Sequence, residues 1–191
     1  MSFQTSLRDG DLLRCMLYME EMQDINVSFE HLGGASPLLL ACKHGAVDVA
    51  KVLLGRGANI NQRDSQERTA IFWAASVGQS ECLRLLLDWC EDLDLEGGNH
   101  LSPLNCAAYN DHFDCLCMLL EKGAIVDTQN TMGWTPLHYA ALYNDTSTLD
   151  VLATHMADPY IQNIQGETAL DVAVRERRSD SVSFLNKYMK K

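Results

Sequence analysis

Two groups of apolar side chains recur at helical spacing within residues 130–162. The first group is Leu137, Ala140 and Ala141, and the second is Leu149, Val151 and Leu152. Each group predicts one amphipathic helix, because residues three and four apart share a helix face. The alanines of the first group are small where that helix must approach its neighbours closely. A polar connection of about ten residues follows the second group and predicts a loop.

The ends of the first helix are marked by residues with capping roles. Thr135 supplies a hydroxyl for the N-cap, and Pro136 suits the first helical position. Asn144 stands where the helix should end, and asparagine tolerates the left-handed backbone that this point requires. We therefore expect a helix that begins at Pro136 and ends before Asn144.

The same pattern occurs five times at an interval of 33 residues, without an insertion or a deletion. The helix-start residues are Ser36, Thr69, Ser102, Thr135 and Thr168, which open SPLLLACKHG, TAIFWAASVG, SPLNCAAYND, TPLHYAALYN and TALDVAVRER. A fixed period of this length predicts one supersecondary unit that has been copied and stacked. The position of Asn144 is filled in the other copies by Gly45, Gly78, Asp111 and Arg177. Because Arg177 does not favour a left-handed backbone, the last copy is expected to be imperfect.

These motifs resemble the ankyrin repeat. The resemblance rests on TPLHYAA at 135–141, on GANIN at 57–61 and on the period, and it covers about residues 31–191. It implies an all-α repeat solenoid of stacked helix–turn–helix–hairpin units. We expect a single ankyrin-repeat domain over residues 1–191. Its expected parts are an N-terminal cap at 1–30, full repeats at 31–63, 64–96, 97–129 and 130–162, and a C-terminal capping repeat at 163–191.

Two further expectations come from the resemblance alone. His138 is the one histidine that stands at the histidine position of the repeat motif, and the resemblance implies that it ties the hairpin backbone to the helix. Asn61, within LLGRGANIN, resembles sites in ankyrin repeats that asparaginyl hydroxylases modify.

The charge of the chain is acidic and unevenly distributed. Residues 1–174 carry 9 Lys and Arg against 24 Asp and Glu, and residues 175–191 carry 6 against 2, which gives −11 in total. An acidic body repels nucleic acid and anionic membranes and favours a basic partner surface. The simpler alternative is that the acids keep the protein soluble. No apolar run approaches the ~18 residues of a membrane span, and early charges leave no room for a signal peptide.

Seven cysteines occur without disulfide-like spacing, and several stand where the repeat uses small apolar residues, as Cys42, Cys82 and Cys115 do. This usage is typical of reduced thiols in a cytoplasmic protein, with the nucleus as a second expected location. Cys115 and Cys117 would point about 200° apart on a helix, so they do not complete a tetrahedral metal site with His112. We expect neither a metal nor a cofactor.

Positions that vary between copies are free for recognition, whereas positions that repeat are structural. In ankyrin repeats the free positions lie on the loop tip and on the inner face of the first helix, and here they hold many aromatic residues. The candidate partner-binding residues are Arg68, Trp73, Leu101, Tyr109, Met132, Trp134, Tyr139, Leu142 and Tyr143. Tyr and Trp recur at binding hot spots. The alternative is that Trp73 and Tyr139 pack into the stack. Five units at the usual helix spacing of ~10 Å would present a concave groove of ~50 Å.

A protein-binding adaptor or scaffold is the function that this pattern favours, with a partner that offers a basic or apolar-anchored segment. One alternative is a dedicated inhibitor or assembly chaperone of one partner, since no attached effector domain is visible. Another is a delivered effector of a pathogen, which would show the same sequence features. An enzyme is not expected, because no histidine pairs with a nucleophile at a helix start and the glycines lie at repeat turns. Polar end caps favour a monomer.

Overall fold

The computed structural model describes residues 2–90, 92–94 and 96–190. Within these residues the secondary structure is helical, and the one β-type pairing is an isolated bridge between Phe29 and Ala35. The α-helices are α1 (Phe3–Arg8), α2 (Leu12–Glu21), α3 (Pro37–Lys43), α4 (Val47–Gly55), α5 (Ala70–Ser76), α6 (Ser80–Leu87), α7 (Pro103–Tyr109), α8 (Phe113–Glu121), α9 (Pro136–Tyr143), α10 (Thr146–Thr154), α11 (Ala169–Arg175) and α12 (Ser179–Tyr188). The predicted all-α class is therefore confirmed. None of these helices is long and apolar enough to cross a membrane.

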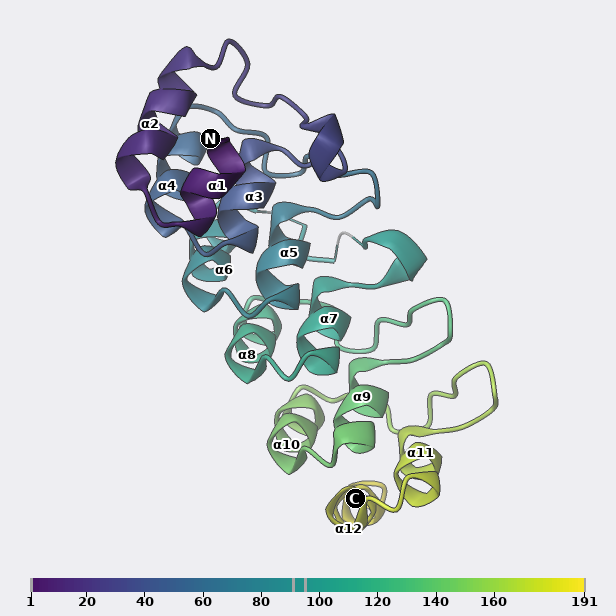
Figure 1. The fold of residues 1–191 in the computed structure, drawn as a ribbon. Helices are drawn as coiled ribbons and strands as arrows, with labels where there is room; N and C mark the ends of the chain where they lie inside the picture. The colour runs from purple at the N-terminus through teal and green to yellow at the C-terminus, as the bar shows by residue number, and fades with distance from the viewer. Residues whose placement is uncertain (1, 91, 95, 191) are drawn as a thin grey trace. The chain divides into compact units, whose positions relative to one another are not determined.

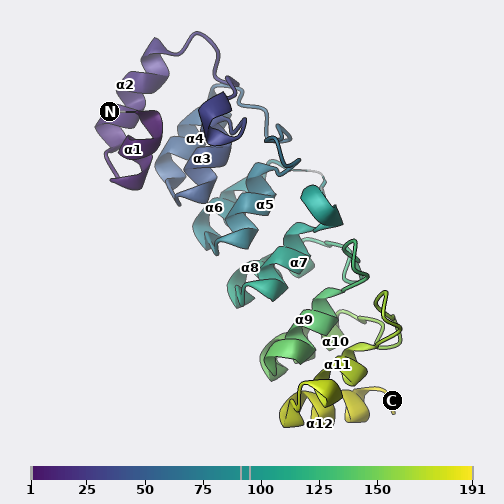
Figure 2. The ribbon, with the colours of Figure 1, turned by 45° about the vertical axis from the view of Figure 1, so that its right-hand side comes forward.

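The chain divides into two compact units, Met1–Gly98 and Asn99–Lys191. In the first unit the helices form the pairs α1/α2, α3/α4 and α5/α6, with α3 packed beside α5 (Figure 1). In the second unit the pairs are α7/α8, α9/α10 and α11/α12, and α9 lies between α7 and α11 (Figure 2). One helix pair falls in each range that the sequence analysis assigns to a repeat or cap. The repeat boundaries themselves, and the single domain over residues 1–191, stay predictions.

Every predicted helix start is confirmed by a side-chain cap. At each of the five positions the Ser or Thr hydroxyl accepts the backbone N–H of the residue three places on. The helix predicted from Pro136 ends at Tyr143, and Asn144 follows it with a left-handed φ of 61°. Arg177 also has a left-handed φ, 57°, so the last copy keeps the same turn without a favourable residue. The repeat geometry thus overrides the preference of that side chain.

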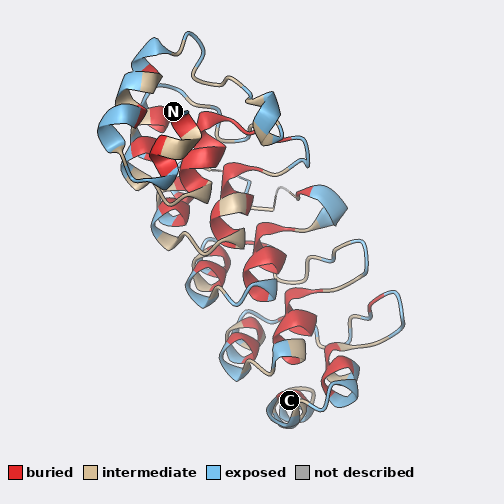
Figure 3. Ribbon diagram, in the orientation of Figure 1, coloured by how far each residue is buried: buried red, intermediate tan, exposed pale blue. Residues whose placement is uncertain are grey.

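The core consists of the first helices and one face of each second helix (Figure 3). In α3 six consecutive residues, from Pro37 to Cys42, are buried, because the helix is covered by its partner and by neighbouring pairs. The alanine pairs Ala74/Ala75 and Ala140/Ala141 are buried where helices approach closely. All seven cysteines lie within the described residues as thiols, and five of them are buried.

The loops between helix pairs are joined by one backbone hydrogen bond per repeat. The donors and acceptors are Ser65 N to Gly33 O (2.9 Å), Gly98 N to Gln66 O (2.8 Å), Thr131 N to Asn99 O (3.0 Å) and Ile164 N to Met132 O (3.1 Å). Each bond joins residues 32 places apart, so it links equivalent loops of successive copies. We call these four bonds the loop straps.

Candidate functional site

Asn130 organises the loop that precedes α9. Its Oδ1 accepts the backbone N–H groups of Met132 (3.0 Å) and Trp134 (2.9 Å). Its Nδ2 donates to the phenolic oxygen of Tyr139 at 2.7 Å. Asparagine favours such turns because its short side chain bonds to nearby backbone. One side chain therefore sets the positions of three candidate residues.

Four candidate residues of the second unit meet in one aromatic cluster, which comprises Tyr109, Trp134, Tyr139 and Tyr143. The Tyr139 ring lies 5.1 Å from Trp134 and 5.3 Å from Tyr109, and Tyr109 lies 6.2 Å from Tyr143, measured between ring centroids. These distances and the tilted or edge-on ring planes are typical of favourable aromatic pairs. The structure thus brings together residues from α7, α9 and the loop before α9.

The rings of the aromatic cluster differ in their exposure to solvent. Tyr109 is 50% exposed and Tyr143 is 43% exposed, whereas Tyr139 is only 8% exposed. Burial raises the pKa of Tyr139 to about 12, so its phenol stays protonated at neutral pH. Trp134 is half-buried and also contacts the His138 ring at 5.7 Å. Tyr109 and Tyr143 are therefore the two rings that an incoming molecule would meet.

The other apolar candidates of the second unit lie outside the aromatic cluster. Met132 is exposed at the loop tip, where a loop strap joins it to the exposed Ile164. Leu101 and Leu142 are half-buried. The loop tips thus add two exposed apolar side chains, Met132 and Ile164, to the surface of the second unit.

Trp73 and Arg68 lie in the first unit, where charged side chains contact the candidate aromatic residue. The Trp73 ring has Lys43 Nζ and Arg68 Cζ each 4.1 Å from its centroid, which are cation–π distances. Its indole nitrogen donates to Asp64 Oδ2 at 3.1 Å, and Arg68 forms an ion pair with the same carboxylate at 2.8 Å. Burial opposes ionisation of Asp64, but the hydrogen bonds from Arg68, Gln66 and Trp73 lower its pKa. The half-buried Trp73 ring is therefore already in contact with two cationic side chains of the same unit.

Asp64 and Asn130 play the same part in two copies of the repeat. Each lies nine residues before the aromatic residue that it bonds, Trp73 or Tyr139, and each accepts two backbone N–H groups of its own loop. Asn163 repeats the loop bonds in the last copy. Periodicity alone did not single out these residues, although Asp or Asn at the same repeat position in three copies was a signal that would have found them.

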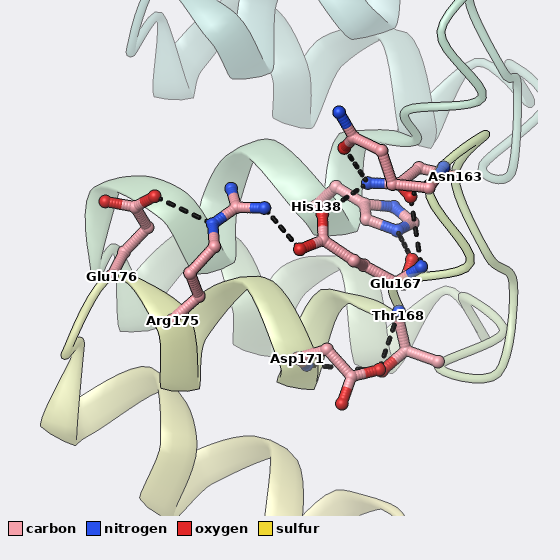
Figure 4. Close-up of polar contacts among 8 residues, drawn as sticks. His138, Asn163, Glu167, Thr168, Asp171, Arg175 and Glu176 are labelled. Atoms are coloured by element: carbon pink, nitrogen blue, oxygen red, sulfur yellow. Dashed lines mark hydrogen bonds and ion pairs between the residues drawn. The ribbon is translucent and has the colours of Figure 1, made fainter.

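In the last copy, Glu167 and Glu176 both form ion pairs with Arg175. Figure 4 shows Glu167 between Asn163, which donates to it at 3.0 Å, and Arg175, which forms an ion pair with it. Arg175 also pairs with Glu176 at 3.0 Å. The hydrogen bonds from Asn163 and Arg175 lower the pKa of Glu167. These carboxylates are therefore engaged within the unit.

His138 ties the helix to the next loop, as the resemblance implied. The backbone N–H of Thr135 donates to its Nδ1 at 3.2 Å, which leaves the proton on Nε2. Nε2 then donates to the backbone oxygen of Glu167 at 3.0 Å (Figure 4). The ring is buried, so this histidine has a structural role. Asn61 is exposed in the first unit, and its hydroxylation stays a prediction.

Comparisons with known proteins agree with this architecture. The family model for ankyrin repeats (3 copies) matches residues 38–130 and 107–191. Fem-1 homolog A-like protein of Mus musculus is 33% identical over 93 residues, which cover 49% of this chain and 14% of that protein. Human transient receptor potential cation channel subfamily A member 1 is 33% identical over 99 residues, which cover 50% and 9%. Inversin of Gallus gallus is 33% identical over 101 residues, which cover 51% and 8%. The chain therefore spans only a small part of the length of these relatives.

Proposed function

The chain belongs to the ankyrin-repeat family, and from that membership we propose that it is a protein-binding module that acts as an adaptor or scaffold. Ankyrin repeats mediate protein–protein interaction through surfaces that stacked units present. The proposal includes no catalytic activity.

The observation that carries this proposal is the aromatic cluster of the second unit. Two of its rings, Tyr109 and Tyr143, are about half exposed, although aromatic packing holds them in place. Rigid, exposed tyrosines give a large contact area at a low cost in conformational entropy, which is why they recur at hot spots. The exposed Met132, in the loop before α9, would add an apolar contact.

The partner proposed for this surface is a protein with a basic or apolar-anchored segment. The chain carries a net charge of −11, which would attract a basic segment and raise its association rate. The same charge disfavours nucleic acid and anionic membranes. We further propose that the protein is a monomer in the cytoplasm, with the nucleus as a second location.

The test compares the wild type with the double variant Tyr109→Ala, Tyr143→Ala. Affinity capture from native cells identifies partners, and titration calorimetry with each purified partner gives the affinity. Binding should weaken by at least about 2 kcal/mol, or roughly thirtyfold, because truncation removes both exposed rings. Helical content, measured by circular dichroism, should not change.

The matched control is Trp89→Ala, which removes a 57% exposed aromatic ring from the first unit. It should bind as the wild type does. A partner that binds the double variant with unchanged affinity would overturn the proposed surface. Stoichiometry decides the role: an adaptor holds at least two partners at once, whereas an inhibitor abolishes the activity of one.

A further inference from the structure

The two exposed rings of the aromatic cluster form one side of a recess. It has a volume of about 570 Å³ and is lined by Tyr109, Asn110, Asp111, Tyr143 and Asp145. These residues come from the ends of α7 and α9 and from the turns that follow them. The recess therefore joins two aromatic surfaces to two carboxylates, and none of the described residues that line it is basic.

The two carboxylates of the recess belong to Asp111 and Asp145. Among the residues that the structure describes, neither Asp111 nor Asp145 forms an ion pair. Asp145 uses Oδ1 to cap α10, accepting the N–H groups of Ser147 (3.0 Å) and Thr148 (3.1 Å). Both capping bonds go to the same oxygen, so the second oxygen does not take part in the cap. The contrast is with Glu167 and Glu176, which both form ion pairs with Arg175.

We propose that this recess receives an arginine side chain of the partner protein. A guanidinium is planar and always charged, so it stacks on aromatic faces and donates paired hydrogen bonds to carboxylates. The recess offers both kinds of contact and a net charge that attracts a cation. The inference rests on the proposed function, because it names the anchor that the same surface takes.

A small probe tests the recess without the natural partner. The tripeptide acetyl-Gly-Arg-Gly-amide is titrated into the full chain while amide and tyrosine ring signals are followed by NMR. Its citrulline analogue has nearly the same shape but no charge. Arginine should give saturable shifts at Tyr109, Asp111, Tyr143 and Asp145 in the millimolar range, and citrulline should bind at least about tenfold more weakly.

The matching variant is Asp111→Asn, Asp145→Asn, which removes the charges and preserves the fold. Asparagine tolerates the left-handed backbone of Asp111, whose φ is 61°, and it is as good an N-cap as Asp145. The control is Asp150→Asn, which removes an exposed charge from α10 outside the recess. The double variant should lose at least about tenfold in affinity for the arginine probe, and the control should lose none.

The outcomes separate this inference from the proposed function. Arginine and citrulline probes that bind equally, or shifts that survive in the double Asn variant, would overturn the arginine site. A natural partner that is lost with Tyr109→Ala, Tyr143→Ala but kept by Asp111→Asn, Asp145→Asn would uphold the binding surface and overturn the arginine anchor. Loss with both variants, and not with Asp150→Asn, supports both.

Discussion

His138 keeps a neutral imidazole inside the second unit, because both of its ring nitrogens have fixed partners. Nδ1 accepts from Thr135, and Nε2 donates to Glu167. Burial lowers the pKa of His138, although the bond to Glu167 acts in the opposite direction. Protonation of Nδ1 would also leave the Thr135 N–H without its acceptor.

Stability should therefore fall as the pH drops below about 6.5, the pKa of histidine in the unfolded chain. Between that pH and the lower pKa of the folded state, His138 is protonated in the unfolded chain but neutral in the folded protein. This single group contributes a slope of up to about 1.4 kcal/mol per pH unit. Urea denaturation of the wild type and of His138→Gln at pH 5 to 8 measures the slope.

His44 is an internal comparison for this experiment, because burial and the neighbouring Lys43 and Arg8 also lower its pKa. His44 contributes the same pH dependence of stability to the wild type and to His138→Gln. The difference between the two slopes therefore isolates His138. Identical slopes for the wild type and His138→Gln would show that His138 does not titrate as proposed.

The aromatic candidates show what single positions in a sequence do and do not reveal. The period placed Trp73 and Tyr139 in one column, and the structure gives both a bond to the Asx residue nine places earlier. Their surroundings differ for a reason that periodicity does not contain. Lys43 and Arg68 cover Trp73, whereas two other tyrosines contact or flank Tyr139. Side-chain contacts between successive copies had to be seen in three dimensions.

At the scale of elements, capping chemistry made the helix starts predictable. A Ser or Thr hydroxyl that accepts the backbone N–H three residues on is a local motif, and it set the start of α9 at Pro136. The turn at Arg177 was not predictable in this way. Its left-handed backbone is imposed by the packing of α11 against α12, which outweighs a local cost of about 1–2 kcal/mol.

The loops offer a direct measure of how closely successive copies approach. Gly133 and Gly166 occupy the same position in two loops, with φ of 72° and 77°. A Cβ at Gly133 would lie 2.9 Å from Asn163 Cα and 3.0 Å from Ile164 N, whereas a Cβ at Gly166 would meet nothing within 4 Å. Both substitutions strain the backbone equally, but only one disturbs a neighbouring loop.

Gly166→Ala should destabilise the protein by about 1 kcal/mol, the cost of a left-handed alanine. Gly133→Ala should cost at least about 1 kcal/mol more, because the neighbouring backbone must move. Urea denaturation of the two variants and the wild type gives the difference. Equal losses would mean that the two loops are not in contact in solution.

At the scale of the whole molecule, the 33-residue period predicted the fold class and the family but not where the copies differ in structure. The repeat position that holds Asp64, Asn130 and Asn163 in three copies holds His31 in the first copy and Gly97 in the third. A Cβ at Gly97 would lie 2.9 Å from atoms of both Arg68 and Phe72, so a side chain fits poorly there. This loop lacks the organising Asx side chain, and the first compact unit ends one residue later, at Gly98.

The loop straps have a mechanical consequence. Each joins a copy only to the next one, so a stretching force meets a series of separate fastenings instead of one shared clamp. A copy that loses both its strap and its helix packing would release 33 residues, or about 110 Å of extended chain. Force spectroscopy should record repeated extensions of that size at low force. A single extension of the whole chain would contradict this. Repeated extensions would mean that the protein yields to force one repeat at a time, as a compliant spring does.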